Sequence, residues 1–263
     1  MEFKTIKYQV AGSRATVTIN RPERRNAFDH QTAEELLAAF TMAEKDEAVR
    51  LVIFTGVGSC FCAGGDVKAM NQARVEDKLP LFLEEVSIAI NRVVFAMRTM
   101  KKPVLGRING HAVGAGLGIL LGCDILVAAS TAKLSAGFTG IGLAPGCSTY
   151  FLPRAMGYNR AAEFLFTRET IDANTARELG LLNYMVEPEE LDSKIDELAA
   201  RIESGPTLSI GWCKELLNAS LKNSMVEQMR LEASSIGASG WTEDAKDGIA
   251  SFVEKRKPVF TGK

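Results

Sequence analysis

The sequence predicts an α/β fold in which a unit of strand, strand and helix recurs, followed by a C-terminal region made of helices. Short apolar runs alternate with longer segments of helical apolar spacing, and glycine-rich turns separate them. The recurring units cover residues 3–44, 49–70, 102–123 and 125–156, and they share an order of elements but no sequence repeat. From Ala161 onward the pattern is helical, and we expect no further strands.

The first unit begins with two apolar runs, residues 3–10 and 15–19, which a Gly-Ser turn joins as in a hairpin. A helical pattern follows over residues 31–44. Asp29 precedes it and is a suitable N-cap, because a carboxylate can accept hydrogen bonds from the free amides of the first turn.

The second unit opens on residues 49–54, a continuous apolar run typical of a strand buried on both faces. A glycine-rich turn then leads into a helix near Val67. Residues 71–80 are polar and of mixed charge, and we expect a mobile loop there. Residues 81–100 return to helical spacing, and Pro103 ends that helix.

The C-terminal part contains helical patterns at residues 160–167, 172–179, 188–203, 207–220, 224–237 and 241–255. We therefore divide the chain into a core of strand-strand-helix units, residues 1–200, and a helical region, residues 201–263, for oligomerisation and as a lid.

Composition sets limits on the kind of protein. The chain has 263 residues, of which 46% are hydrophobic and 24% charged, and its net charge is −1. Such a balance gives no support for nucleic acid or an anionic membrane as a partner. The five cysteines are odd in number and lack C-x-x-C spacing, and no targeting or membrane-spanning run is visible, so we expect a cytoplasmic protein.

Two glycine-rich strand-to-helix junctions carry the functional signal. They lie in residues 55–70 and 102–124. The first N–H groups of a helix lack internal partners, which makes each junction an anion site. Neither junction has the dinucleotide-binding glycine pattern or a Walker lysine. Two N–H groups converging on one oxygen, an oxyanion hole, fit this pattern better than a phosphate site.

The motifs that carry a family resemblance are FCAGGDVKAM (61–70), INGHAVGAGLGILLGCDI (108–125), GIGLAPG (140–146), FTRETIDANTARELGLLNYMV (166–186) and FVEKRKPVF (252–260). With them the chain resembles the enoyl-CoA hydratase/isomerase (crotonase) superfamily, and most of all the phenylacetate-pathway and Δ3,Δ2-enoyl-CoA isomerases. The resemblance implies a spiral of ββα units, an acyl-CoA substrate, and a homotrimer or dimer of trimers. It implies no metal and no separate cofactor, because coenzyme A is part of the substrate.

The resemblance also implies site residues. The backbone N–H groups of Gly65 and Ala115 would hold the thioester oxygen as it becomes an enolate. Residues implied to line the coenzyme A site are Arg25, Ala27, Ala63, Asp66, Val67 and Lys68, with Phe252 and Lys255 reaching the coenzyme A of a neighbouring subunit. For Asp66 the alternative is an N-cap of the following helix, and for the basic residues it is a solvated surface charge.

The usual catalytic carboxylates of the family are missing. Their positions carry Gly118, Phe138 and Gly146. Glu84 and Glu85 are the candidates to replace them, with a solvent-facing position as the alternative for both. Tyr150, Cys62 and Cys147 are expected near the pocket, and His30 on its acyl side, with a purely structural position as the alternative for His30. His111 is more often a packed, hydrogen-bonded residue than a base, and Asp124 is expected to be structural.

We therefore expect an enzyme that stabilises a thioester enolate and performs isomerisation, decarboxylation or an atypical hydration. Decarboxylation gains weight because it needs an oxyanion hole more than it needs a base. The alternative is a catalytically weak paralogue that binds CoA thioesters. RNA binding is disfavoured by the near-neutral charge and the lack of a basic helix.

Overall fold

A computed structural model describes residues 2–263. The strands are β1 (Ile6–Ala11), β2 (Arg14–Ile19), β3 (Leu51–Gly56), β4 (Cys60–Cys62), β5 (Val104–Ile108), β6 (His111–Val113), β7 (Ile125–Ala129), β8 (Lys133–Ser135), β9 (Thr170–Asp172) and β10 (Tyr184–Val186). The helices are α1 (His30–Lys45), α2 (Val67–Val75), α3 (Leu79–Thr99), α4 (Ala115–Leu120), α5 (Leu152–Met156), α6 (Tyr158–Thr167), α7 (Ala173–Glu178), α8 (Leu191–Glu203), α9 (Thr207–Ser220), α10 (Met225–Ser239) and α11 (Glu243–Glu254). Short 3₁₀ turns lie at Pro22–Arg24, Thr139–Ile141 and Pro188–Glu190.

Two sheets organise the core, and successive strands alternate between them. The six-stranded sheet has the order β1-β2-β3-β5-β7-β10, and the four-stranded sheet has the order β4-β6-β8-β9. In each of the second, third and fourth units the first strand therefore joins the large sheet and the second joins the small one. This alternation is the predicted spiral of ββα units, with a hairpin, β1–β2, as its first turn.

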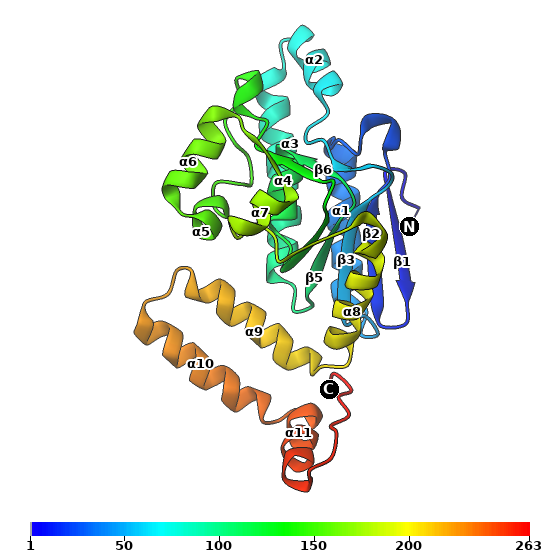
Figure 1. Cartoon of the computed structure of the whole chain (residues 1–263), viewed down its shortest axis with the longest axis vertical. Helices are drawn as coiled ribbons and strands as arrows, with labels where there is room; N and C mark the ends of the chain where they lie inside the picture. Colours follow the sequence, from blue (N-terminus) through cyan, green and yellow to red (C-terminus); the bar gives the residue numbers. More distant parts are fainter. Residues whose placement is uncertain (1) are drawn as a thin grey trace.

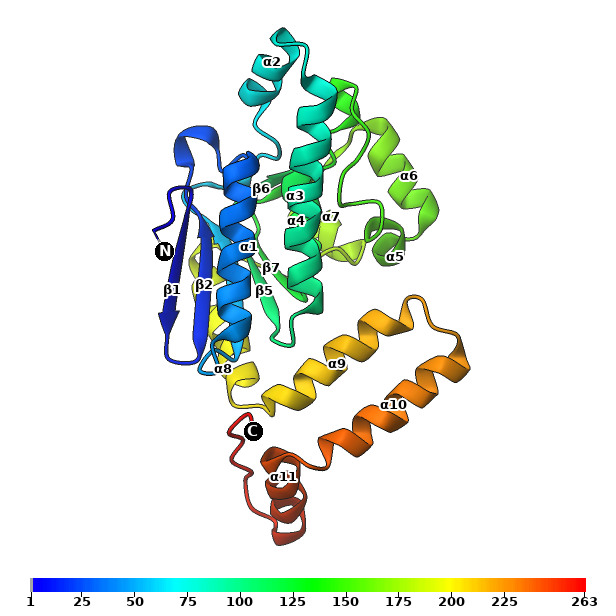
Figure 2. The same ribbon diagram turned by 180° about the vertical axis from the view of Figure 1, so that it is seen from behind.

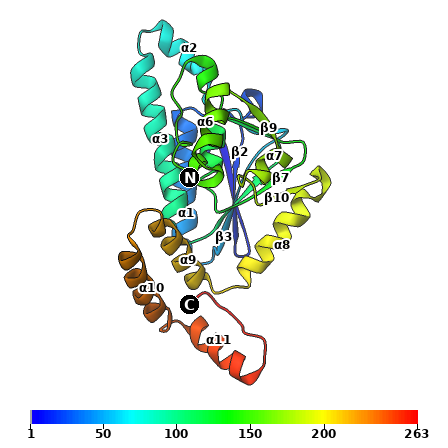
Figure 3. The same cartoon turned by 60° about the vertical axis from the view of Figure 1, so that its left-hand side comes forward.

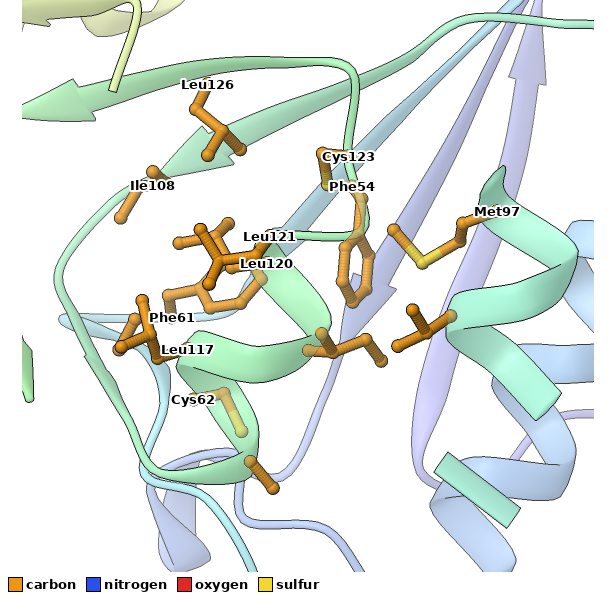
Figure 4. Packing of buried hydrophobic residues seen from close by; sticks show 14 of the residues in the cluster. Phe54, Phe61, Cys62, Met97, Ile108, Leu117, Leu120, Leu121, Cys123 and Leu126 are labelled. Carbon is orange, nitrogen blue, oxygen red and sulfur yellow. The ribbon is translucent and has the colours of Figure 1, made fainter. Parts of the chain in front are cut away.

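Helices cover both faces of the large sheet. α1 and α3 lie side by side on one face, and α8 crosses the other (Figures 1 and 2). α4 is enclosed in the main core, where all of its residues are buried. Figure 4 shows Leu117 and Leu120 of α4 within this cluster, together with Phe54, Phe61 and Met97. A helix buried on all sides is a rigid base for whatever its N-terminus presents.

The last three helices form an arm that extends from the core (Figure 1). α9 contacts the core through Lys214, whose ammonium group donates to the carbonyl oxygens of Met97 at 2.6 Å and Lys102 at 3.0 Å. It also pairs with Asp124 at 2.7 Å, which gives that carboxylate the structural role expected for it. Residue 201, the predicted boundary, lies inside α8, so the arm itself begins at α9.

Most predicted elements are confirmed, including Asp29 as the N-cap of α1, which accepts a hydrogen bond from the Thr32 N–H at 2.8 Å. The prediction of no strands after Ala161 is wrong, because β9 and β10 complete the two sheets. Each has only three residues, too few to show an alternating pattern. The loop expected at residues 71–80 is also largely wrong, because α2 continues to Val75 as a mostly exposed helix.

Candidate active site

The two glycine-rich junctions lie next to each other. β4 and β6 are parallel neighbours in the small sheet, so the segments that leave their carboxyl ends start from the same edge. One segment passes through Gly65 into α2, and the other passes through Gly114 into α4. The sheet thus brings two helix starts together that are about fifty residues apart in sequence.

Glycine is required where these segments touch. A Cβ on Gly64 would lie 2.8 Å from the Val113 carbonyl oxygen, and a Cβ on Gly116 would collide with the carbonyl oxygen of Cys62. Gly64 and Gly114 also have φ angles of 92° and 55°, which side chains rarely allow. The glycines therefore permit both the turns and the close approach of the two backbones.

The N–H groups of Gly65 and Ala115 have no acceptor among residues 2–263. The Gly65 group is free because the bridge to Phe28 uses the neighbouring atoms: Phe28 N–H donates to Gly64, and Asp66 N–H donates to Phe28. The Ala115 group is free because Ala115 is the first residue of α4. Both residues line one cavity, so the predicted pair of donors is brought together there.

This cavity has a volume of about 530 Å³, within the usual range for ligand sites. Its wall is mainly apolar and comes from α2, α3, the second junction and the segment after β8. The larger apolar side chains are Val67, Met70, Leu83, Val86, Ile90, Val113, Phe138, Ile141, Leu143 and Pro145, and the alanines are Ala63, Ala115 and Ala144. The polar side chains in the wall are those of Glu84, Ser87 and Cys147.

Of the two candidate glutamates, Glu84 lines this cavity and Glu85 does not. Glu85 instead lines a smaller cavity of about 290 Å³ between α2 and α3, together with Gln72 and Lys78. Successive residues of a helix point about 100° apart, so the orientation of α3 separates the two carboxylates. Glu84 is exposed, which places its carboxylate at the solvent side of the cavity.

Ser87 is a polar residue of the cavity wall that the sequence interpretation missed. It lies one turn after Glu84 on the same face of α3. The i, i+3 spacing from Glu84 is the signal that would have found it, once the inward face of the helix is known.

The three positions without carboxylates differ in the space they offer. At Gly118 the space is filled, because a Cβ there would lie 2.8 Å from the Cys147 Cβ and 3.0 Å from the Gly146 carbonyl oxygen. At Gly146 it is open, and the nearest atom to an added Cβ would be the Ser87 hydroxyl oxygen at 3.7 Å. Phe138 contributes its ring to the cavity wall.

Cys147 itself has an unusual conformation. Its φ angle is 61°, in the left-handed region that favours glycine. Its thiol donates to the Asn91 side-chain oxygen at 3.0 Å. Burial raises the pKa of this thiol to about 11, so it stays protonated at neutral pH.

Six of the eight residues predicted for coenzyme A lie in or beside the first junction. Ala63 and Val67 line the cavity. Arg25 and Lys68 are exposed, whereas Ala27 is buried.

Asp66 has several partners within the protein. Its carboxylate accepts from the amides of Lys68 at 3.1 Å and Ala69 at 3.3 Å, and it pairs with Arg21 at 3.2 Å. Asp66 is thus the N-cap of α2, the alternative that the sequence offered.

Phe252 and Lys255 lie on and just after α11, in the arm. α2 and α11 are at opposite ends of the molecule in all three views (Figures 1 to 3), so within one chain these residues are far from the first junction. Phe252 is 87% exposed.

The other polar candidates lie outside the cavity wall. His30 and His111 are exposed at the starts of α1 and β6, and Tyr150 lines a different cavity. Cys62 is buried against Gly116, and burial raises the pKa of its thiol. Among residues 2–263 no group of His, Cys, Asp and Glu is arranged to hold a metal ion. None of the helices described combines the length and apolar character needed to cross a membrane.

Comparison with known proteins shows the family of this chain. The family model described as enoyl-CoA hydratase/isomerase matches residues 10–263. Among curated proteins, the chain is 33% identical to a trans-2-decenoyl-[acyl-carrier-protein] isomerase of Streptococcus mutans, over 100% of both chains. It is 33% identical to the 1,2-epoxyphenylacetyl-CoA isomerase of Escherichia coli, over 94% of this chain and 95% of that protein.

Similar solved structures include enoyl-CoA hydratases of Bacillus anthracis and of a Polaromonas species. Both superpose with a TM-score of 0.92 at 28% identity; the first alignment covers 99% of this chain and 100% of that one, the second 97% and 99%. The family match therefore extends over both the spiral core and the helical arm. The chain belongs to the enoyl-CoA hydratase/isomerase family.

Proposed function

We propose that this protein acts on an acyl-CoA thioester by stabilising the enolate that forms when charge moves onto the thioester oxygen. The observation that carries the proposal is the pair of free N–H groups, on Gly65 and Ala115, at the wall of one apolar cavity. Two preorganised donors in such surroundings stabilise a developing oxyanion strongly, because little water competes for them. The apolar wall suits an acyl chain.

Within this chemistry we propose isomerisation by proton transfer, with Glu84 as the base. Glu84 is the one carboxylate in the cavity wall. Shifting a double bond moves a proton from one carbon to another, which a single carboxylate can do by taking the proton and returning it. Hydration of the family's usual kind employs two carboxylates, and Gly118, Phe138 and Gly146 supply none.

Two printed names among the relatives support this choice. Both the Streptococcus mutans and the Escherichia coli proteins are called isomerases. One name specifies an acyl-carrier-protein thioester and the other a CoA thioester. The thioester is the group that the two N–H donors would hold in either case.

The second candidate is a thioester-binding protein with little catalysis of its own. The observation that favours it is the filled space at Gly118, where Cys147 excludes any side chain. Such a protein would retain the two N–H donors and the apolar cavity while lacking a carboxylate on α4. Decarboxylation is compatible with the same arrangement, because loss of CO₂ generates an enolate without a base.

Hydrogen exchange at the carbon next to the thioester separates these possibilities. We would incubate the protein in D₂O with 3-enoyl-, 2-enoyl- and saturated acyl-CoA esters, and follow deuterium incorporation and double-bond position by mass spectrometry and NMR. Conversion between 3-enoyl and 2-enoyl esters, reduced about 10²–10⁴-fold by Glu84→Gln, is the expected result. Glu85→Gln is the matched control and should leave the rate unchanged.

Other outcomes would contradict the proposal in distinct ways. Tight binding without exchange or isomerisation would favour the binding protein. In a parallel incubation with a 2-carboxyacyl-CoA, release of CO₂ by a protein that isomerises none of the enoyl esters would favour the decarboxylase. An equal loss of activity in the Glu84 and Glu85 variants would remove Glu84 as the specific base.

We also propose that the arm assembles the protein into a homotrimer or a dimer of trimers. Large apolar side chains are exposed along it, among them Trp241 at 84% and Phe252 at 87%. A second copy that covered these side chains would bring Phe252 and Lys255 toward a neighbour's coenzyme A. Light scattering coupled to size exclusion measures the oligomer, and a monomer at micromolar concentration would exclude it.

A further inference from the structure

A second cavity lies behind the candidate active site. It has a volume of about 410 Å³ and lies between α3, the segment from Cys147 to Phe151, and the end of α9. Its lining residues are Asn91, Val94, Phe95, Arg98, Thr99, Cys147, Thr149, Tyr150, Phe151, Asn218 and Lys222. Among the residues that line the two cavities, Cys147 alone belongs to both walls.

At Cys147 the walls of the two cavities share a residue. Next to Cys147 the wall of the first cavity includes Gly146, which has no side chain, and Gly118 lies so close that an added Cβ there would be 2.8 Å from the Cys147 Cβ. The thiol is held in place by its hydrogen bond to Asn91, a residue of the second cavity. The left-handed backbone at Cys147 would be better suited by glycine, so a side chain is kept here in spite of a conformational cost.

The second cavity is suited to hydrocarbon. Its lining includes Val94, Phe95 and Phe151, of which Phe95 is 70% exposed. Of the two cations in its lining, Lys222 is exposed, and Arg98 is already engaged: it pairs with Asp124 at 3.5 Å and lies 5.8 Å from the centre of the Phe151 ring. An apolar chain that entered would therefore meet aliphatic and aromatic carbon rather than an unpaired guanidinium group.

We propose that Cys147 sets the length of acyl chain that the protein accepts, by closing the first cavity against an apolar extension formed by the second. This inference rests on the proposed function, because it assumes that an acyl chain occupies the first cavity. In the wild-type protein the chain ends against the Cys147 side chain. Removing that side chain joins the two cavities and lets longer chains bind with their ends between α3 and Phe151.

The test measures affinity for saturated acyl-CoA esters from four to sixteen carbons by calorimetry, since saturated chains have no double bond to move. Each methylene buried in apolar surroundings should tighten binding about fourfold. In the wild-type protein the affinity should stop rising at the acyl-chain length that reaches Cys147. In Cys147→Gly, which also suits the local backbone, the gain should continue over several further methylenes.

Two further variants make the test specific. Cys147→Ser keeps the size of the side chain and the hydrogen bond to Asn91. Its affinity for acyl-CoA should stop rising at the same chain length as in the wild-type protein. Thr149→Trp, combined with Cys147→Gly, fills the second cavity from an exposed position and should restore the wild-type limit. Circular dichroism would confirm that each variant is folded.

The outcomes distinguish this inference from the function on which it rests. Binding of acyl-CoA with the same length limit in Cys147→Gly as in the wild type would overturn the inference alone. If Cys147→Gly accepts longer acyl chains and the added Thr149→Trp substitution does not shorten them again, the acyl chain does not enter the second cavity. That result would overturn the inference as well. Failure of every acyl-CoA to bind would overturn the proposed function together with the inference.

Discussion

The two junctions that form the candidate oxyanion hole each present a backbone N–H group, but the contacts that hold them in place differ. The first, from β4 to α2, is held by polar contacts: Asp66 caps α2 and pairs with Arg21, which in turn pairs with Asp29 at 2.9 Å. The second, from β6 to α4, is held by packing, because every residue of α4 is buried and its glycines touch neighbouring backbone.

This difference shows where each junction tolerates change. A polar support loses a cap or an ion pair when one residue is replaced, which weakens the local helix by a modest amount. A packed support has no spare volume, so an added methyl group must displace backbone. The second junction should therefore be the more sensitive to substitution, and the first the more adaptable.

Removal of the Ala115 N–H donor from the second junction should have the largest effect of the changes that compare the two junctions, and the effect is on kcat. Ala115→Pro deletes the N–H group, and proline is acceptable at the first position of a helix. We expect a loss of about 10²–10³-fold in kcat for enolate formation, measured as deuterium incorporation at the carbon next to the thioester. Ala115→Ser keeps the N–H group and serves as the control. A proline variant with wild-type turnover would show that the Ala115 N–H does not contact the oxyanion.

A carboxylate side chain should destabilise the fold at Gly118, where the space is filled, but not at Gly146, where the space is open. Gly118→Glu must push Cys147 and the Gly146 carbonyl aside, and should destabilise the fold by about 1–3 kcal/mol or more. At Gly146→Asp the added Cβ meets the Ser87 hydroxyl at 3.7 Å and the Phe138 ring at 3.9 Å, which are ordinary contacts, and the variant should fold normally. Urea unfolding compares the two. Equal stabilities would mean that the segment around Cys147 adapts freely.

A smaller effect on stability is expected at the first junction, which polar contacts support. Asp66→Ala removes the cap of α2 and should lower the free energy of unfolding by about 0.5–2 kcal/mol, as urea titration would show. Asp172→Ala is a matched control, because Asp172 caps α7 through the Thr175 amide at 2.8 Å, away from the cavity. If Asp66→Ala kept full stability but lost acyl-CoA affinity, Asp66 would be a ligand contact rather than a cap.

The smallest effect concerns the chemical reactivity of the Cys147 thiol, which packs on α4. Because burial raises the pKa of Cys147 to about 11, its reactive thiolate is scarce at pH 8 and increases only as the pH approaches that value. Iodoacetamide at pH 8 should therefore label the exposed Cys213 first, as peptide mass spectrometry would show. Rapid labelling of Cys147 would mean that the packed junction opens readily to solvent.

The backbone part of the site was predictable from the sequence. An N–H donor belongs to the main chain, so a strand, a glycine turn and a helix start suffice to indicate the two junctions, and the family resemblance then pointed to Gly65 and Ala115 within them. The same local logic identified Asp29 as a cap. The very short strands β9 and β10 were not predictable, because three residues form a strand only when a sheet edge is already present to pair with them.

The side-chain part was decided by the tertiary structure. Glu84 and Glu85 are adjacent and chemically alike, and only the orientation of α3 against the core places one in the cavity and the other outside it. Likewise, no local pattern connects Gly118 with Cys147, whose side chain fills the space above that glycine. The sequence by itself determined most of the fold and the two glycine-rich junctions, because these follow from local backbone preferences. Which side chains face the substrate depends on how distant elements pack.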